Sequence, residues 1–101
     1  KWIISSLSSS ARIYIDHGAS KALKSGKSLL PSGVIKIEGN FKKGDNIIIV
    51  DNNNIDIARA LSSFASEEIN KIKGLQSNQI ENILGYASKS EIIHKNDIVI
   101  L

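Results

Sequence analysis

The four residues Ser25-Gly26-Lys27-Ser28 are of the types that bind the phosphates of a nucleotide. A phosphate-binding P-loop has the pattern Gly-x-x-x-x-Gly-Lys-Ser/Thr and leads from a strand into a helix. In this chain position 21, where the first glycine should stand, is Lys. The surrounding residues also predict the reverse order, with a helix before the segment and a strand after it. We therefore interpret the segment as a helix end that leads into a strand, and not as an ATP site.

Asp16, His17 and the many serines are the residue types of a hydrolase. A catalytic triad needs a nucleophile held against a base, and the chain has no Gly-x-Ser-x-Gly elbow. His17 and His94 belong to unrelated segments, and Asp97, three residues after His94, is too little for a metal-ligand set. Because the chain has no cysteine, thiolate zinc sites and thiol catalysis are excluded. We expect no catalytic residue, no metal site and no cofactor in this chain.

A basic surface is the strongest candidate for binding. The net charge is +3, and eight of the thirteen lysines and arginines lie in residues 1–50. Lys21 and Lys24 are one helical turn apart and Lys27 follows at the helix exit, so the three could line one side. With Ser28 and Arg59 they form our candidate RNA-binding set. No aromatic residue accompanies the lysines, so we expect contact with phosphates but not base stacking. A solvated lysine-rich surface is the alternative.

Short apolar segments predict the strands that must position these residues. They cover residues 12–16, 34–39, 46–51, 55–62, 91–94 and 97–101. Short helices are predicted at 18–26, 67–73 and 78–84, each ending at a glycine. We assign their caps to Asp16, Ser66 and Ser77. The pattern predicts a mixed β fold with short helices: a pseudo-barrel of five to six strands plus about three short helices.

Three turns join these elements. Pro31-Ser32-Gly33 precedes the strand at 34–39, and Lys43-Gly44-Asp45 precedes the strand at 46–51. Asn52–Asn54 forms a hairpin tip, because Asn tolerates the left-handed conformation that such a turn requires.

Arg59 conflicts with strict alternation in its strand. Alternation would place Arg59 on one face with Ile55, Ile57 and Leu61, among aliphatic neighbours. Either the strand carries a bulge, or Arg59 pairs with a carboxylate at the edge of the barrel. We favour a structural role for Arg59 over contact with nucleic acid.

The chain is long enough for one domain, and we treat residues 1–101 as a single unit. It lacks methionine even at position 1, so we expect a piece of a longer protein. Residues 1–10 contain a run of serines and are expected to join it to an upstream domain; Trp2, Ile3 and Ile4 either pack in the barrel or form part of a docking surface. Without cysteine, signal peptide or apolar span, we expect a cytoplasmic location and no membrane partner.

Motifs in order along the chain resemble a PUA domain, and most closely the C-terminal PUA domain of bacterial glutamate 5-kinases. The resemblance rests on Asp16-x-Gly18-Ala19-x-x-Ala22-Leu23, Gly26-Lys27-Ser28-Leu29-Leu30-Pro31-x-Gly33-Val34 and Gly39-x-Phe41-x-x-Gly44-Asp45, with further matches from Trp2 to Asp97. In this motif Asp16, Gly18, Ala19, Pro31, Gly33, Gly44 and Asp45 are implied to be structural. The chain departs from the family at Ala11 and Ala60, where glycine is usual, and at Phe64, where tyrosine is usual.

The resemblance implies a non-catalytic accessory or regulatory domain. In that family an N-terminal amino-acid-kinase domain uses ATP and Mg to phosphorylate L-glutamate, the first step of proline biosynthesis. Its kinase domain and neighbouring subunits are then the expected partners. The alternative implied by other PUA domains is an RNA-binding module that uses the lysine-lined helix and the turn after it. A glycine at the position of Ala60 allows close approach of RNA in such modules, so Ala60 argues against this alternative.

Overall fold

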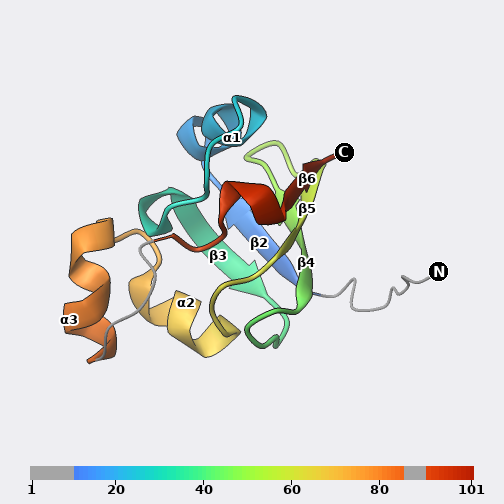
Figure 1. Cartoon of the computed structure of the whole chain (residues 1–101). Helices are drawn as coiled ribbons and strands as arrows, with labels where there is room; N and C mark the ends of the chain where they lie inside the picture. The colour runs from blue at the N-terminus through green and yellow to red at the C-terminus, as the bar shows by residue number, and fades with distance from the viewer. Residues whose placement is uncertain (1–10, 86–90) are drawn as a thin grey trace.

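The computed structural model describes residues 11–85 and 91–101, which form a five-stranded mixed sheet with three short helices. The strands are β2 (Arg12–Ile15), β3 (Val34–Glu38), β4 (Asn46–Val50), β5 (Asp56–Leu61) and β6 (Ile98–Ile100). Their order is β3-β2-β4-β5-β6, with β2 and β4 parallel and the other neighbours antiparallel. The mixed β fold with short helices is confirmed as an open, curved form of the predicted pseudo-barrel (Figure 1). The expectations for residues 1–10 lie outside the described residues.

The predicted strand at 91–94 is wrong. Ile93 forms only an isolated antiparallel bridge with Leu29, and residues Lys95–Asp97 form a 3-10 turn before β6. This bridge still ties the segment after the first helix to the segment before β6, because the amide of Leu29 donates to the carbonyl of Ile93 at 3.0 Å.

The helices are α1 (His17–Lys24), α2 (Ser66–Ile72) and α3 (Ile80–Leu84). Asp16 caps α1 as predicted, but the caps assigned to Ser66 and Ser77 are wrong. Ser66 is the first residue of α2, and Ser77 begins a 3-10 turn that leads into α3. The hydroxyl of Ser66 instead accepts a hydrogen bond from the buried amide of Phe41 at 3.2 Å. Propensity alone does not show that a tertiary partner will use this hydroxyl.

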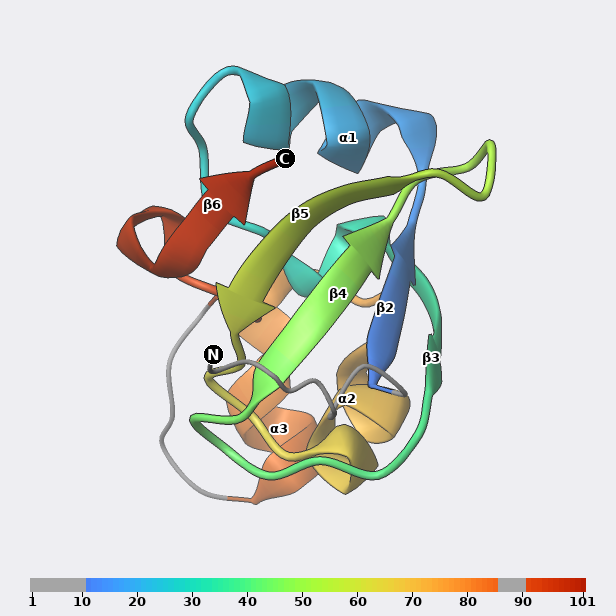
Figure 2. The ribbon, with the colours of Figure 1, turned by 90° about the vertical axis from the view of Figure 1, so that its right-hand side faces the viewer.

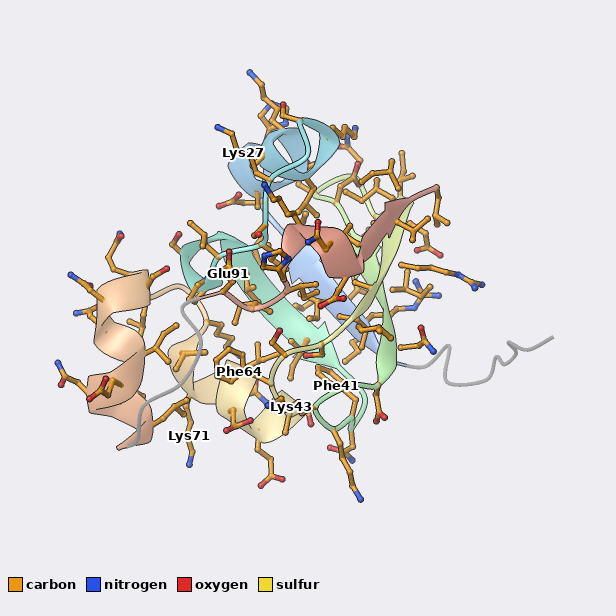
Figure 3. The ribbon with its side chains drawn as sticks, in the orientation of Figure 1. Lys27, Phe41, Lys43, Phe64, Lys71 and Glu91 are labelled. Atoms are coloured by element: carbon orange, nitrogen blue, oxygen red, sulfur yellow. The ribbon has the colours of Figure 1, made fainter. Side chains whose placement is uncertain are left out.

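The core lies on one side of the sheet. Ile13 and Ile15 of β2 are fully buried, as are Ile47 and Ile49 of β4. α2 and α3 lie on this inner side, while α1 lies across the top of the sheet (Figure 1). Phe41 and Phe64 lie close to α2 at the lower end of the molecule, and both are buried (Figure 3). None of the described helices has the length and apolar character needed to cross a membrane.

None of the described helices covers the opposite side of the sheet, which is called uncovered in that sense (Figure 2). Figure 2 looks onto it, with β5, β4, β2 and β3 in front and the helices α2 and α3 behind them. This arrangement follows from the alternation in β2 and β4, whose buried residues alternate with half-buried or exposed ones up to Ile49.

Candidate functional site

Asp16 joins the start of α1 to the turn before β3. Its carboxylate accepts a hydrogen bond from the amide of Ala19 at 2.8 Å, which caps the helix. Its own amide donates to the carbonyl of Gly33 at 3.0 Å. Asp16 therefore holds α1 and the Pro31–Gly33 turn together, and these two segments are the walls of the groove described below.

Gly33 and Ala19 form the closest contact between these walls. A Cβ placed on Gly33 would lie only 2.5 Å from the Cβ of Ala19. The helix can approach the Pro31–Gly33 turn this closely because residue 33 has no side chain. Pro31 is buried beside it, and the carbonyl of Pro31 accepts from the amide of Gly74 at 2.7 Å.

The segment Gly26-Lys27-Ser28 is the C-terminal cap of α1. Gly26 has a φ of +84°, its amide donates to Leu23, and the amide of Lys27 donates to Ala22. These two bonds are those of a Schellman motif, in which a left-handed glycine satisfies the last carbonyls of a helix. The backbone amides of Gly26 and Lys27 are thus used within the helix end and do not form a phosphate cradle. The interpretation as a helix end is confirmed.

Ser28 has a structural partner. Its hydroxyl accepts a hydrogen bond from the amide of Lys95 at 2.8 Å, which holds the exit of α1 against the turn before β6. Next to it, the Nδ1 of His94 accepts from the amide of Asn96 at 3.1 Å. His94 therefore serves as the cap of a 3-10 turn.

A shallow groove runs between α1 and the Pro31–Gly33 turn. Its volume is about 280 Å³, and it is lined by Asp16, Gly18, Ala19, Ala22, Ser28, Leu30, Ser32 and Gly33. The side chains of Lys21, Lys24 and Lys27 are exposed, and Lys27 extends away from the body of the molecule at the exit of α1 (Figure 3). The structure thus places Lys21 and Lys24 on the helix that forms one wall of the groove, and Lys27 just after the end of that helix. Lys21 and Lys24 also lie in the last turn of α1, where positive charge is favourable with or without a ligand.

Arg59 belongs to a different surface. β4 and β5 are in register from Asn46↔Leu61 to Ile49↔Ala58, but Val50 pairs with Asp56, which leaves Ile57 as the extra residue of a bulge. Ile57 and Ala58 are consequently both buried, and Arg59 is exposed on the uncovered side of the sheet. The bulge resolves the conflict that strict alternation created for this arginine.

A second groove contains Arg59. It has a volume of about 520 Å³ and is lined by Asn46, Arg59, Ala60, Leu61, Asn96, Asp97 and Val99. It shares no lining residue with the groove beside α1. Ala60, one of the departures from the family, is only 3% exposed, so its methyl group adds to the core.

Gly44 and Asp45 shape the turn before β4. Gly44 has a φ of +90°, and the carboxylate of Asp45 accepts from the amide of Lys42 at 2.8 Å. The amide of Gly44 donates to the carbonyl of Ser62 at 2.7 Å. These bonds hold the turn before β4 against the end of β5.

A polar cluster that the sequence did not predict lies on the side of β2 and β3 that faces away from the core. The hydroxyl of Tyr14 donates to a carboxylate oxygen of Glu38 at 2.8 Å, and the Nζ of Lys36 lies 4.5 Å from the centre of the Tyr14 ring. The hydrogen bond to Glu38 raises the pKa of Tyr14 above its ordinary value. Nearby, Arg12 and Asp56 form an ion pair of 2.6 Å. The sequence could have indicated this cluster only through side chains that face one another across β2 and β3. Finding those pairs requires the register of the two strands, which the sequence did not predict.

No group of three or more histidine, aspartate or glutamate side chains in residues 11–85 and 91–101 is arranged to hold a metal ion. His17 is exposed on α1. The arrangement around α1 is suited to contact with an anionic surface, since it offers cations and a groove but no activated nucleophile.

The family model of the PUA domain matches residues 11–84. This chain belongs to the PUA domain family. It is 58% identical over 99 residues to a glutamate 5-kinase of Pelagibacter ubique, covering 98% of this chain and 27% of that protein. It is 50% identical over 101 residues to a glutamate 5-kinase of Thermoanaerobacter sp. (strain X514), again covering 27% of the relative. The chain therefore spans about a quarter of the length of these relatives.

Solved structures share the fold. A PUA domain from Aeropyrum pernix in complex with tartrate has a TM-score of 0.62 at 19% identity, covering 84% of this chain and 41% of that one. The archaeal box H/ACA sRNP Nop10-Cbf5 complex contains a chain with a TM-score of 0.59 at 21% identity, covering 90% of this chain and 23% of that one. At these identities the similarity establishes the fold alone.

Proposed function

We propose that this PUA domain is the non-catalytic accessory domain of a glutamate 5-kinase. The observation that carries the proposal is 50–58% identity along almost the whole chain to about 27% of such kinases. The remainder of the parent, an amino-acid-kinase domain, would phosphorylate L-glutamate with ATP and Mg in the cytoplasm, at the start of proline biosynthesis. The PUA domain would act by docking on that domain or on neighbouring subunits, and through them on regulation by proline.

The local geometry of this chain agrees with a non-catalytic role. The segment most like a nucleotide site, Gly26-Lys27-Ser28, has its amides and its hydroxyl occupied by the end of α1 and by Lys95. The phosphoryl transfer would therefore depend on residues of the kinase domain, with the PUA domain outside the reacting centre.

The test is an assay of ATP-dependent glutamate phosphorylation with three proteins: the full-length parent, its kinase domain alone and residues 1–101 alone. We expect activity in the first two, a different response to proline between them, and no activity in the third. Phosphorylation by residues 1–101 alone, or a parent that does not phosphorylate glutamate, would overturn the proposal.

A second candidate function, RNA binding, is favoured by one observation. α1 and the turn after it present Lys21, Lys24 and Lys27 to solvent, and a groove that Ser28 lines runs along this helix. A structural neighbour is a chain of the archaeal box H/ACA sRNP Nop10-Cbf5 complex. Arg59 contributes from its separate groove only if an RNA extends from one surface to the other.

Fluorescence anisotropy with a structured RNA at two salt concentrations tests this candidate. Binding through phosphates should weaken as salt rises. Replacing Lys21, Lys24 and Lys27 together by Glu should abolish it. The matched control replaces the exposed lysines Lys42, Lys43 and Lys71 by Glu, with the same change in net charge. Equal loss in both triple variants would indicate general electrostatic attraction and would contradict a site on α1.

A further inference from the structure

On the side of β4, β5 and β6 that no described helix covers, apolar side chains lie beside one arginine (Figure 2). We call this surface the open face and define it by Ile48, Arg59, Leu61 and Val99. The strand register places Ile48, Arg59 and Val99 directly beside one another across three strands. Leu61 lies two residues from Arg59, and therefore on the same side of β5.

The apolar side chains of the open face are unusually exposed for a sheet. Val99 is 65% exposed and Leu61 is 41% exposed. Single exposed apolar residues are normal on a protein surface, but neighbours that form a patch indicate an interaction site. The groove of about 520 Å³ lies on this surface, so it is also hollowed. No described helix lies over it (Figure 2).

The charge of the open face indicates what its partner must carry. Arg59 is exposed and forms no ion pair with another described residue, although Asp97 lines the same groove; Arg12, in contrast, is paired with Asp56. An apolar partner without a negative charge would leave the Arg59 guanidinium desolvated and unpaired when it docks. The fitting partner therefore combines apolar side chains with a carboxylate opposite Arg59.

The position of the open face relative to the chain favours a partner in the same polypeptide. The carbonyl of Ala11 accepts from the amide of Ile48 at 3.0 Å, so the chain that precedes β2 reaches the sheet beside β4. A kinase domain that precedes this region in the same polypeptide would be tethered at the start of β2, and a tethered partner needs a smaller interface than a free one.

We propose that the open face docks against the kinase domain of the same chain, through an apolar surface that presents a carboxylate to Arg59. The inference rests on the proposed function, because it takes the attached domain to be that kinase. It assigns the contact to the β4-β5-β6 side of the sheet and leaves the α1 groove free.

The test measures the rate at which single cysteines react in the full-length protein. Val99→Cys probes the open face. Ile35→Cys is the matched control, since Ile35 is 54% exposed on the other edge strand and its neighbour Lys36, not Ile35, shares the side of Tyr14. Residues 1–101 have no cysteine, so mass spectrometry of peptides from this region identifies each alkylated site.

We expect Val99→Cys to react at least about tenfold more slowly than Ile35→Cys, because a docked face is protected for most of the time. Adding Arg59→Glu, which places a carboxylate opposite the partner's carboxylate, should raise the rate of Val99→Cys to that of the control. The protection should be independent of protein concentration.

Equal rates for the two cysteines in an active kinase would overturn the inference and leave the proposed function intact. Protection that increases with protein concentration would assign the face to a second molecule, and protection only when RNA is added would assign it to RNA; both outcomes contradict docking in the same chain. A parent without glutamate kinase activity would overturn the proposed function, and this inference with it.

Discussion

Gly33 and Ala19 are in contact across the two walls of the α1 groove, and a Cβ on Gly33 would lie 2.5 Å from the Cβ of Ala19. The distance is below any that two unbonded carbon atoms adopt, so the contact requires glycine at position 33. Both residues belong to the motifs that resemble the PUA family.

Gly33→Ala should therefore destabilise the domain. Added volume in a packed contact costs about 1–3 kcal/mol. Urea unfolding of wild type, Gly33→Ala, Ala19→Gly and the double variant forms a cycle that isolates this contact. The double variant should recover part of the loss from Gly33→Ala, offset by about 1 kcal/mol for glycine in a helix. Strict additivity of the two single changes would contradict direct contact.

Asp16→Ala should remove the cap of α1. The carboxylate accepts from the amide of Ala19 at 2.8 Å, and losing such a cap costs about 0.5–2 kcal/mol. Asp16→Asn keeps an acceptor at the same position and should lose much less. Both are measured by urea unfolding. If Asn were as destabilising as Ala, the charge and not the cap would be responsible.

Ser66→Ala should cost about 1–3 kcal/mol, because it leaves the buried amide of Phe41 without its acceptor. Ser77→Ala is the control, since Ser77 does not cap the helix that follows it. Thermal unfolding of both variants should show a clear decrease for Ser66→Ala and little change for Ser77→Ala. A similar decrease in both would contradict a specific contribution of the hydrogen bond to Phe41, because alanine has the higher helix propensity and propensity alone would not lower the stability.

Tyr14 should titrate above its ordinary value of 10.0, because its hydroxyl donates to Glu38. A pKa raised in the folded state stabilises the fold below the ordinary value and loses that contribution as pH rises through the folded pKa. Ultraviolet titration of tyrosinate follows this directly, with Tyr86→Phe as background to remove the second tyrosine of the chain. Glu38→Gln should lower the pKa of Tyr14. An unchanged pKa in that variant would exclude Glu38 as the cause.

The sequence by itself determined the elements whose causes are local. Asp16 caps the first helix, Gly26 ends it in the left-handed conformation, and the Pro31–Gly33 turn precedes β3, because each depends on residues a few positions apart. The same local pattern excluded a P-loop at Gly26-Lys27-Ser28 and supported the PUA fold.

Only the tertiary structure decided which side chains meet across the chain. Serine is a residue type typical of helix caps and loops. The hydroxyl of Ser66 nevertheless accepts a hydrogen bond from the amide of Phe41, 25 positions away, and the hydroxyl of Ser28 accepts one from the amide of Lys95, 67 positions away. The bulge at Ile57 turns Arg59 to the outer side of the sheet and separates it from the lysines of α1. Strand register and long-range hydrogen bonds depend on packing the whole sheet, and a single sequence carries no local signal for them.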